Sequence, residues 1–100
     1  MPEAAPPVAQ SESVTWRRVP DLGLHLRPVG VMVAVYNEES GDTHLVSGWA
    51  AAILERLRVA PARPAELRRH APPAATGDAG SVTRLLRDLW YLGLIEPVDP

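Results

Sequence analysis

The chain has 100 residues, which is enough for one small domain with a single hydrophobic core. Hydrophobic residues make up 46% and there is no cysteine, so we expect a folded domain without thiolate catalysis, disulfide bonds or cysteine-ligated metals. The net charge of −2 is unevenly distributed, because residues 56–87 carry seven arginines against two acidic residues. Such a basic segment can attract an acidic peptide or a nucleic acid, although a solvated helical surface is the simpler interpretation.

Residues 1–13 contain three prolines among small and polar residues, which predicts a disordered leader before one domain over residues 14–97. The first residues lack the basic flank and apolar run of a secretory signal. The longest apolar stretch, Val31–Tyr36, is far shorter than the roughly 18–20 residues of a membrane span. We therefore expect a cytoplasmic protein that does not cross a membrane.

Three segments predict an antiparallel sheet in the first half of the chain. Residues 22–27 alternate between apolar and polar side chains, as in a half-buried strand, and Val31–Tyr36 is apolar on both faces, as in a central strand. The turn at residues 37–42 contains Gly41, which is suited to a positive φ. The chain then returns as a third strand, Thr43–Val46, whose outer edge is open unless another segment covers it.

Three helices are predicted after the sheet. Ser47 is a suitable N-cap for the first, in which apolar residues recur every four positions. A short second helix is expected over residues 65–70, and the third ends at Leu92, before a glycine at the position after the C-cap, Gly93. A short extended piece, residues 94–98, follows. This order predicts an α+β, winged-helix-like domain with a three-stranded antiparallel sheet followed by three helices.

Several segments resemble one known family. Residues 46–54, VSGWAAAIL, resemble the first-helix signature of PqqD-like proteins, and residues 82–95 resemble their last helix, with the spacing V-x-x-L-L-x-x-L-x-x-x-G-L-I. Residues 16–20 and 35–45 resemble the subgroup of PqqD-like peptide chaperones that is associated with an HPr-kinase-related protein. Within the latter segment, SGDTH is the most specific part.

This resemblance covers about residues 14–96 and implies a non-enzymatic peptide chaperone with a winged-helix fold and no cofactor. Proteins of this family bind a precursor or leader peptide and present it to a modifying enzyme, for which the HPr-kinase-related protein is the candidate here. The peptide adds as a strand to the third strand and lies beside the third helix. The chain departs from the family pattern at Ser47, where an asparagine cap is usual, and in lacking a loop glycine between the first two helices. The implied peptide-binding residues are Thr43, His44, Leu45, Val46, Arg84, Leu85, Asp88 and Leu92.

The orientation of these residues is predicted from helical and strand periodicity. The apolar arc of the third helix has Leu85 and Leu92 on one margin and Trp90 on the other, so that either one margin lines a groove or the whole arc belongs to the core. On the third strand we expect Leu45 to face the core. We also expect the main-chain N–H of His44 to lie on the open edge, where a proline would remove a hydrogen bond to the peptide.

The main alternative is a DNA-binding winged-helix regulator. Arg84 and Arg87 face outward on the third helix and could meet phosphates or guanine edges, or else attract an acidic peptide. The exposed Asp88, the negative net charge and the lack of a basic wing oppose DNA binding. Asp42 and His44 could suggest a catalytic dyad, but a turn aspartate and a surface histidine explain them better, so no catalytic or metal-binding residue is expected.

Overall fold

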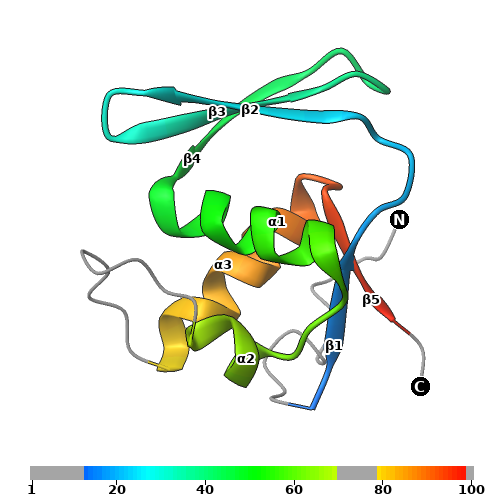
Figure 1. Ribbon diagram of the computed structural model, residues 1–100, viewed down its shortest axis with the longest axis vertical. Coiled ribbons are helices and arrows are strands. Elements are labelled where there is room, and N and C mark those ends of the chain that lie inside the picture. Colours follow the sequence, from blue (N-terminus) through cyan, green and yellow to red (C-terminus); the bar gives the residue numbers. More distant parts are fainter. Residues whose placement is uncertain (1–12, 70–78, 99–100) are drawn as a thin grey trace.

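The computed structural model describes residues 13–69 and 79–98. Its elements follow in the order β1 (Thr15–Arg18), β2 (Leu24–Val29), β3 (Met32–Asn37), β4 (Thr43–Ser47), α1 (Gly48–Val59), α2 (Pro64–Arg68), α3 (Ala79–Tyr91) and β5 (Ile95–Val98). The predicted α+β class, with a three-stranded antiparallel sheet followed by three helices, is confirmed (Figure 1). The predicted leader lies outside the described residues except for Ser13, as does the expected end of the second helix at His70.

The larger sheet has the strand order β2-β3-β4, so that β3 is central as predicted. Both pairings are antiparallel, with Ala34 opposite Arg27 on β2 and opposite Leu45 on β4. The turn between β3 and β4 has φ +79° at Gly41, in agreement with the prediction for that glycine. The Asn37 side chain holds this turn by accepting hydrogen bonds from the main-chain N–H groups of Glu39 and Ser40 at 2.8 and 3.3 Å.

A second sheet, which the sequence did not predict, pairs β1 with β5 in antiparallel fashion (Figure 1). Trp16 in β1 is fully buried, and its main chain exchanges hydrogen bonds of 2.8 and 3.0 Å with Ala62, just before α2. Arg17 forms an ion pair of 2.6 Å with Glu96 across the two strands. These contacts join the start and the end of the described chain to the helical part of the fold.

The helix ends agree with the caps predicted from the sequence. Ser47 is the N-cap of α1, and its hydroxyl accepts a hydrogen bond of 3.1 Å from the N–H of Ala50. At the end of α3, Gly93 has φ +79°, and the N–H of Leu94 donates to the carbonyl of Leu89 at 3.1 Å. This is the Schellman arrangement that favours glycine after a helix.

The core lies where α1 packs beneath the three-stranded sheet and against α3 (Figure 1). The predicted apolar centre of α3 is buried there, namely Val82, Leu86 and Leu89. Among the helices of residues 13–69 and 79–98, none is long and apolar enough to cross a membrane.

Candidate functional site

A groove of about 260 Å³ lies between β4 and α3, beside the first turn of α1. Most of the side chains that line it are apolar, and Asp88 is the one ionisable residue among them. The lining residues are Leu45, Val46, Ser47, Ala50, Leu85, Asp88, Leu89 and Leu92. The groove therefore joins the edge of a sheet to one flank of a helix.

Five of the eight residues implied by the family resemblance line this groove, and the structure brings them together from two distant parts of the chain. They are Leu45, Val46, Leu85, Asp88 and Leu92. The margin of α3 that faces the groove is thus the one formed by Leu85 and Leu92. Trp90, on the opposite margin, packs against the core and contacts the Tyr91 ring instead.

The remaining three predicted residues do not line the groove. Thr43 and His44 lie on β4 beyond it, and Arg84 is an exposed residue of α3. The expected attraction of an acidic peptide through Arg84 or Arg87 is therefore not supported, because the charged side chain in the groove is Asp88. Arg87 approaches that carboxylate at 3.9 Å and offsets part of its charge.

The groove also contains residues that sequence reasoning missed, namely Ser47, Ala50 and Leu89. β4 ends at Ser47 and α1 begins at the next residue, so the first turn of α1 lies directly beside the edge strand. The sequence contained a signal of this arrangement, because the predicted cap, Ser47, directly follows the last residue of the predicted strand, Val46.

The side chains of β4 have the opposite orientation to the one predicted. Leu45 is 59% exposed, whereas Val46 is 7% exposed and belongs to the core. Val46 lies opposite Val33 on β3, and His44 lies opposite the fully buried Val35. Because side chains alternate along a strand, Leu45 is directed to the other face, and the prediction that it faces the core is wrong.

The main chain of β4 presents hydrogen-bonding groups at its outer edge. The main-chain N–H of Asn37 donates to the main-chain carbonyl of Asp42 at 2.8 Å, which makes these two residues a hydrogen-bonded pair of the β3–β4 ladder. In an antiparallel ladder such pairs alternate with non-bonded ones, so His44 and Val46 bond to β3, whereas the N–H and C=O groups of Thr43 and Leu45 point outward. The open N–H groups are thus not at His44, and the prediction that its N–H lies on the open edge is wrong.

The two edges of the sheet differ in what they offer a further strand. Just before β2, the main-chain carbonyl of Gly23 accepts a hydrogen bond of 3.1 Å from the N–H of Glu38. The same alternation from this pair along β2 places the main-chain nitrogen of Pro28 on the outer edge. Proline has no N–H to donate and blunts that edge. β4 contains no proline and has no partner strand on its outer side within the described residues. β4 is therefore the edge that can accept another strand.

The surroundings of Asp42 and His44 agree with ordinary turn and strand residues. The N–H of Asp42 donates to the Ser40 hydroxyl at 3.2 Å, and His44 lies half-buried on β4. Within residues 13–69 and 79–98, no group of three or more histidine and acidic residues is placed to hold a metal ion. Comparison with family models, curated proteins and solved structures finds no match for this chain.

Proposed function

We propose that this protein is a non-enzymatic peptide-binding adaptor that accepts an extended peptide as an additional strand along β4. The observation that carries the proposal is the position of the apolar groove directly beside the open edge of that strand. Main-chain groups of Thr43 and Leu45 supply hydrogen bonds for any peptide sequence, and the groove selects among side chains. Strand addition with side-chain selectivity requires an open strand edge with a side-chain pocket beside it.

The chemistry of the groove favours a particular kind of peptide. Leu45, Leu85 and Leu92 are at least partly accessible and would pack against an apolar side chain of the added strand. Asp88, whose side chain is 56% exposed, lies at the rim and favours a lysine or arginine nearby. We therefore expect a peptide with an apolar anchor and a basic neighbour, in place of the acidic peptide suggested by the arginines of α3.

The family resemblance supports the same proposal from the sequence. The resemblance to PqqD-like chaperones implies a precursor or leader peptide as the ligand and a modifying enzyme as the second partner, with an HPr-kinase-related protein as its candidate. A cytoplasmic location is part of this proposal, because such peptides are modified where they are synthesised. The SGDTH segment that carries the most specific part of the resemblance leads directly into β4.

The test begins with a selection of short random peptides displayed on phage against the purified full chain. The most enriched peptide is synthesised and titrated into isotope-labelled protein, with amide shifts followed by NMR. We expect the largest shifts at residues 43–47 and 85–92, and enrichment of peptides that pair an apolar with a basic residue. The absence of any enriched peptide, or shifts confined to residues 60–69 with β4 unaffected, would contradict the proposal.

A charge reversal in the groove gives a second readout. Asp88→Arg should weaken binding of the selected peptide by about two- to fivefold, as expected for the loss of a partly exposed ion pair. Glu39→Arg, an equal charge change in the turn before β4, should leave the affinity within error after correction for ionic strength. Equal weakening by both variants would mean that the peptide affinity depends only on the net charge of the protein, and would contradict a specific contact at Asp88.

A further inference from the structure

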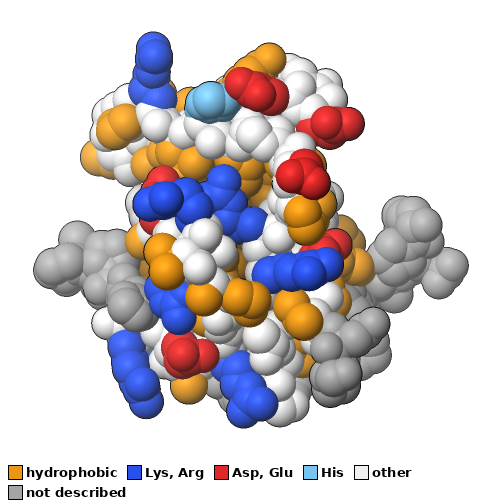
Figure 2. All heavy atoms as spheres, turned by 45° about the vertical axis from the view of Figure 1, so that its right-hand side comes forward, with side chains coloured by type: hydrophobic (Ala, Val, Ile, Leu, Met, Phe, Trp, Pro, Cys, Tyr) orange, Lys and Arg blue, Asp and Glu red, His pale blue; other side chains and the backbone are white. Residues whose placement is uncertain are grey.

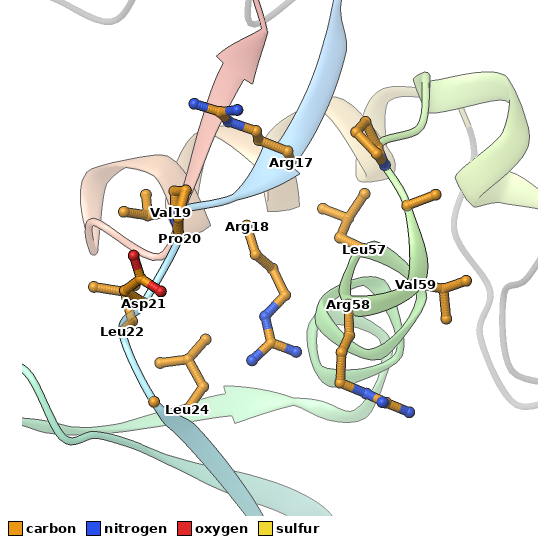
Figure 3. A pocket seen from close by; sticks show the side chains of 13 residues that line it. Arg17, Arg18, Val19, Pro20, Asp21, Leu22, Leu24, Leu57, Arg58 and Val59 are labelled. Carbon is orange, nitrogen blue, oxygen red and sulfur yellow. The ribbon is translucent and has the colours of Figure 1, made fainter.

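A second and larger pocket, of about 520 Å³, lies between the segment that joins β1 to β2 and the C-terminal end of α1 (Figure 3). It shares no lining residue with the groove beside β4. On the face shown in Figure 2, arginine side chains lie beside apolar ones below the three-stranded sheet. The proposed peptide site gives this pocket no role, although Leu22, Leu24 and Leu57 in its lining also pack in or against the core.

The central polar group of the pocket is the guanidinium of Arg18. The side chain leaves β1 and points into the pocket between Leu24 and Arg58 (Figure 3). One nitrogen, Nη1, donates to the main-chain carbonyl of Leu54 at 3.3 Å, which is a long hydrogen bond. A guanidinium has five N–H donors, so this contact leaves most of its donor capacity for a ligand.

Arg18 differs from its two arginine neighbours in how its charge is balanced. Arg17 is paired with Glu96 at 2.6 Å, and Arg58 with Glu55 at 3.2 Å. Across the part of the chain that the structure describes, Arg18 forms no ion pair within 4 Å, and the nearby Glu55 is paired with Arg58. The one acidic residue in the lining, Asp21, belongs to the segment between β1 and β2 and lies apart from the Arg18 guanidinium (Figure 3).

Partial burial makes this unpaired charge costly. Desolvation lowers the pKa of Arg18 from its ordinary value, the charge of Glu55 opposes this effect, and Arg58 adds to it. The group nevertheless stays protonated near neutral pH, because an arginine side chain is too basic to lose its proton there. A half-buried cation that lacks a carboxylate partner gains most from an external anion.

Beside these charged groups, part of the pocket wall is apolar. Leu22 and Leu24 come from the segment that leads into β2, and Leu57 and Val59 come from the last turn of α1. The volume lies within the range of small-molecule sites, which combine apolar walls with a few polar groups. A ligand that satisfies both parts has an anionic head and an apolar body.

We propose that this pocket binds a small amphiphilic anion, in which the Arg18 guanidinium holds a carboxylate or phosphate head group and the leucine side chains pack against the apolar body. The planar guanidinium can bond two oxygens of either head group at once. Because the pocket is separate from the groove beside β4, this inference does not depend on the proposed peptide-binding function.

The test is an NMR titration of the isotope-labelled full chain with six probes: sodium hexanoate, hexyl phosphate, acetate, inorganic phosphate, hexan-1-ol and hexylammonium. We expect saturable shifts at residues 18–24 and 57–61 with the first two, with a Kd on the order of 1 mM for a ligand of this size. Acetate and inorganic phosphate should bind at least about tenfold more weakly, because they lack the apolar body. A preference between hexanoate and hexyl phosphate shows which head group the site favours.

Arg18→Gln should weaken hexanoate binding by about ten- to a hundredfold, the loss expected for charge-assisted hydrogen bonds. Arg27→Gln changes an exposed arginine of β2 outside the pocket and should leave the affinity unchanged. If Arg18→Gln unfolds, as judged by circular dichroism, Arg18→Lys provides the test, because it keeps the charge but loses the bidentate geometry and should bind hexanoate more weakly.

Three outcomes would overturn the inference. Hexan-1-ol or hexylammonium binding as tightly as hexanoate would show an apolar cleft without an anion site. Equal affinity in the wild type and the folded Arg18 variant would remove the proposed head-group ligand. Shifts that fail to saturate well above the expected Kd, or that spread to Arg27 and the other exposed arginines, would show unspecific ionic contact. Peptide binding at β4 should persist in every Arg18 variant that folds.

Discussion

At the scale of single residues, Ser47 joins the fold to the candidate site, because it ends β4, caps α1 and lines the groove. Ser47→Ala removes the oxygen that accepts the Ala50 N–H, and we expect a loss of about 1 kcal/mol in the free energy of unfolding. Urea denaturation followed by circular dichroism measures this loss. Ser47→Asn, which keeps a capping oxygen, should stay within a few tenths of a kcal/mol of the wild type. An alanine variant as stable as the asparagine variant would show that the cap contributes nothing.

The residues that were predicted correctly act over a few positions of the chain. Ser47 as a cap, Gly41 in its turn and Gly93 after α3 each follow from backbone geometry within one turn. Asn37 was not recognised, although its buried amide holds the β3–β4 turn, because Asp42 was the more obvious turn residue. Arg18 was not singled out, because its contact with the Leu54 carbonyl joins β1 to α1, which is distant in sequence.

At the scale of elements, the outward main-chain groups of β4 lead to a prediction with a matched control. Leu45→Pro removes an open N–H as well as a side chain, whereas Leu45→Ala removes the side chain alone. If the Leu45 N–H donates to the peptide, the proline variant should bind the selected peptide about fivefold to a hundredfold more weakly than the alanine variant. Isothermal titration calorimetry measures both affinities.

The fold itself provides the control for this comparison. Leu45→Pro should keep a cooperative thermal transition, because the lost N–H bonds no neighbouring strand. His44→Pro should be strongly destabilised, because that N–H belongs to the ladder with Val35. Equal destabilisation by the two prolines would contradict the assigned edge, and equal peptide affinity in the two Leu45 variants would contradict strand addition at this position.

The elements also show why some periodic patterns predict structure better than others. The apolar arc of α3 defined its buried face, since Val82, Leu86 and Leu89 recur on one side of a helix. The orientation of β4 was not defined in the same way, because Leu45 and Val46 are both apolar and neighbouring strand residues face opposite sides. The pairing of β1 with β5 joins opposite ends of the described chain, and local patterns carry no information on such contacts.

At the scale of the whole molecule, the groove and the anion pocket lie at opposite ends of α1. Ala50 in the first turns of the helix lines the groove, whereas Leu57 and Val59 near its end line the pocket. We expect the two sites to bind independently, because they share no residue and the helix between them packs in the core. Titration of the selected peptide with and without saturating hexanoate should give the same Kd. A change beyond error would show that the sites are coupled through α1.

The distribution of charge over the molecule also bears on the alternative of DNA binding. Arginine side chains are interspersed with acidic and apolar ones on the face shown in Figure 2, and the net charge of the chain is −2. Arg84 is exposed on α3, but Arg87 lies 3.9 Å from Asp88, which reduces the positive charge that the helix presents to phosphates.

We therefore expect only sequence-independent binding to duplex DNA, with a Kd on the order of 10⁻⁴ M or weaker at physiological salt. This binding should disappear as the salt concentration rises. Fluorescence anisotropy with labelled random duplexes over a range of salt concentrations measures this binding, and Arg84→Gln should reduce the salt dependence. Nanomolar binding that discriminates between duplex sequences would favour a DNA-binding regulator over a peptide adaptor, because contacts from Arg84 to base edges would then outweigh the unfavourable net charge.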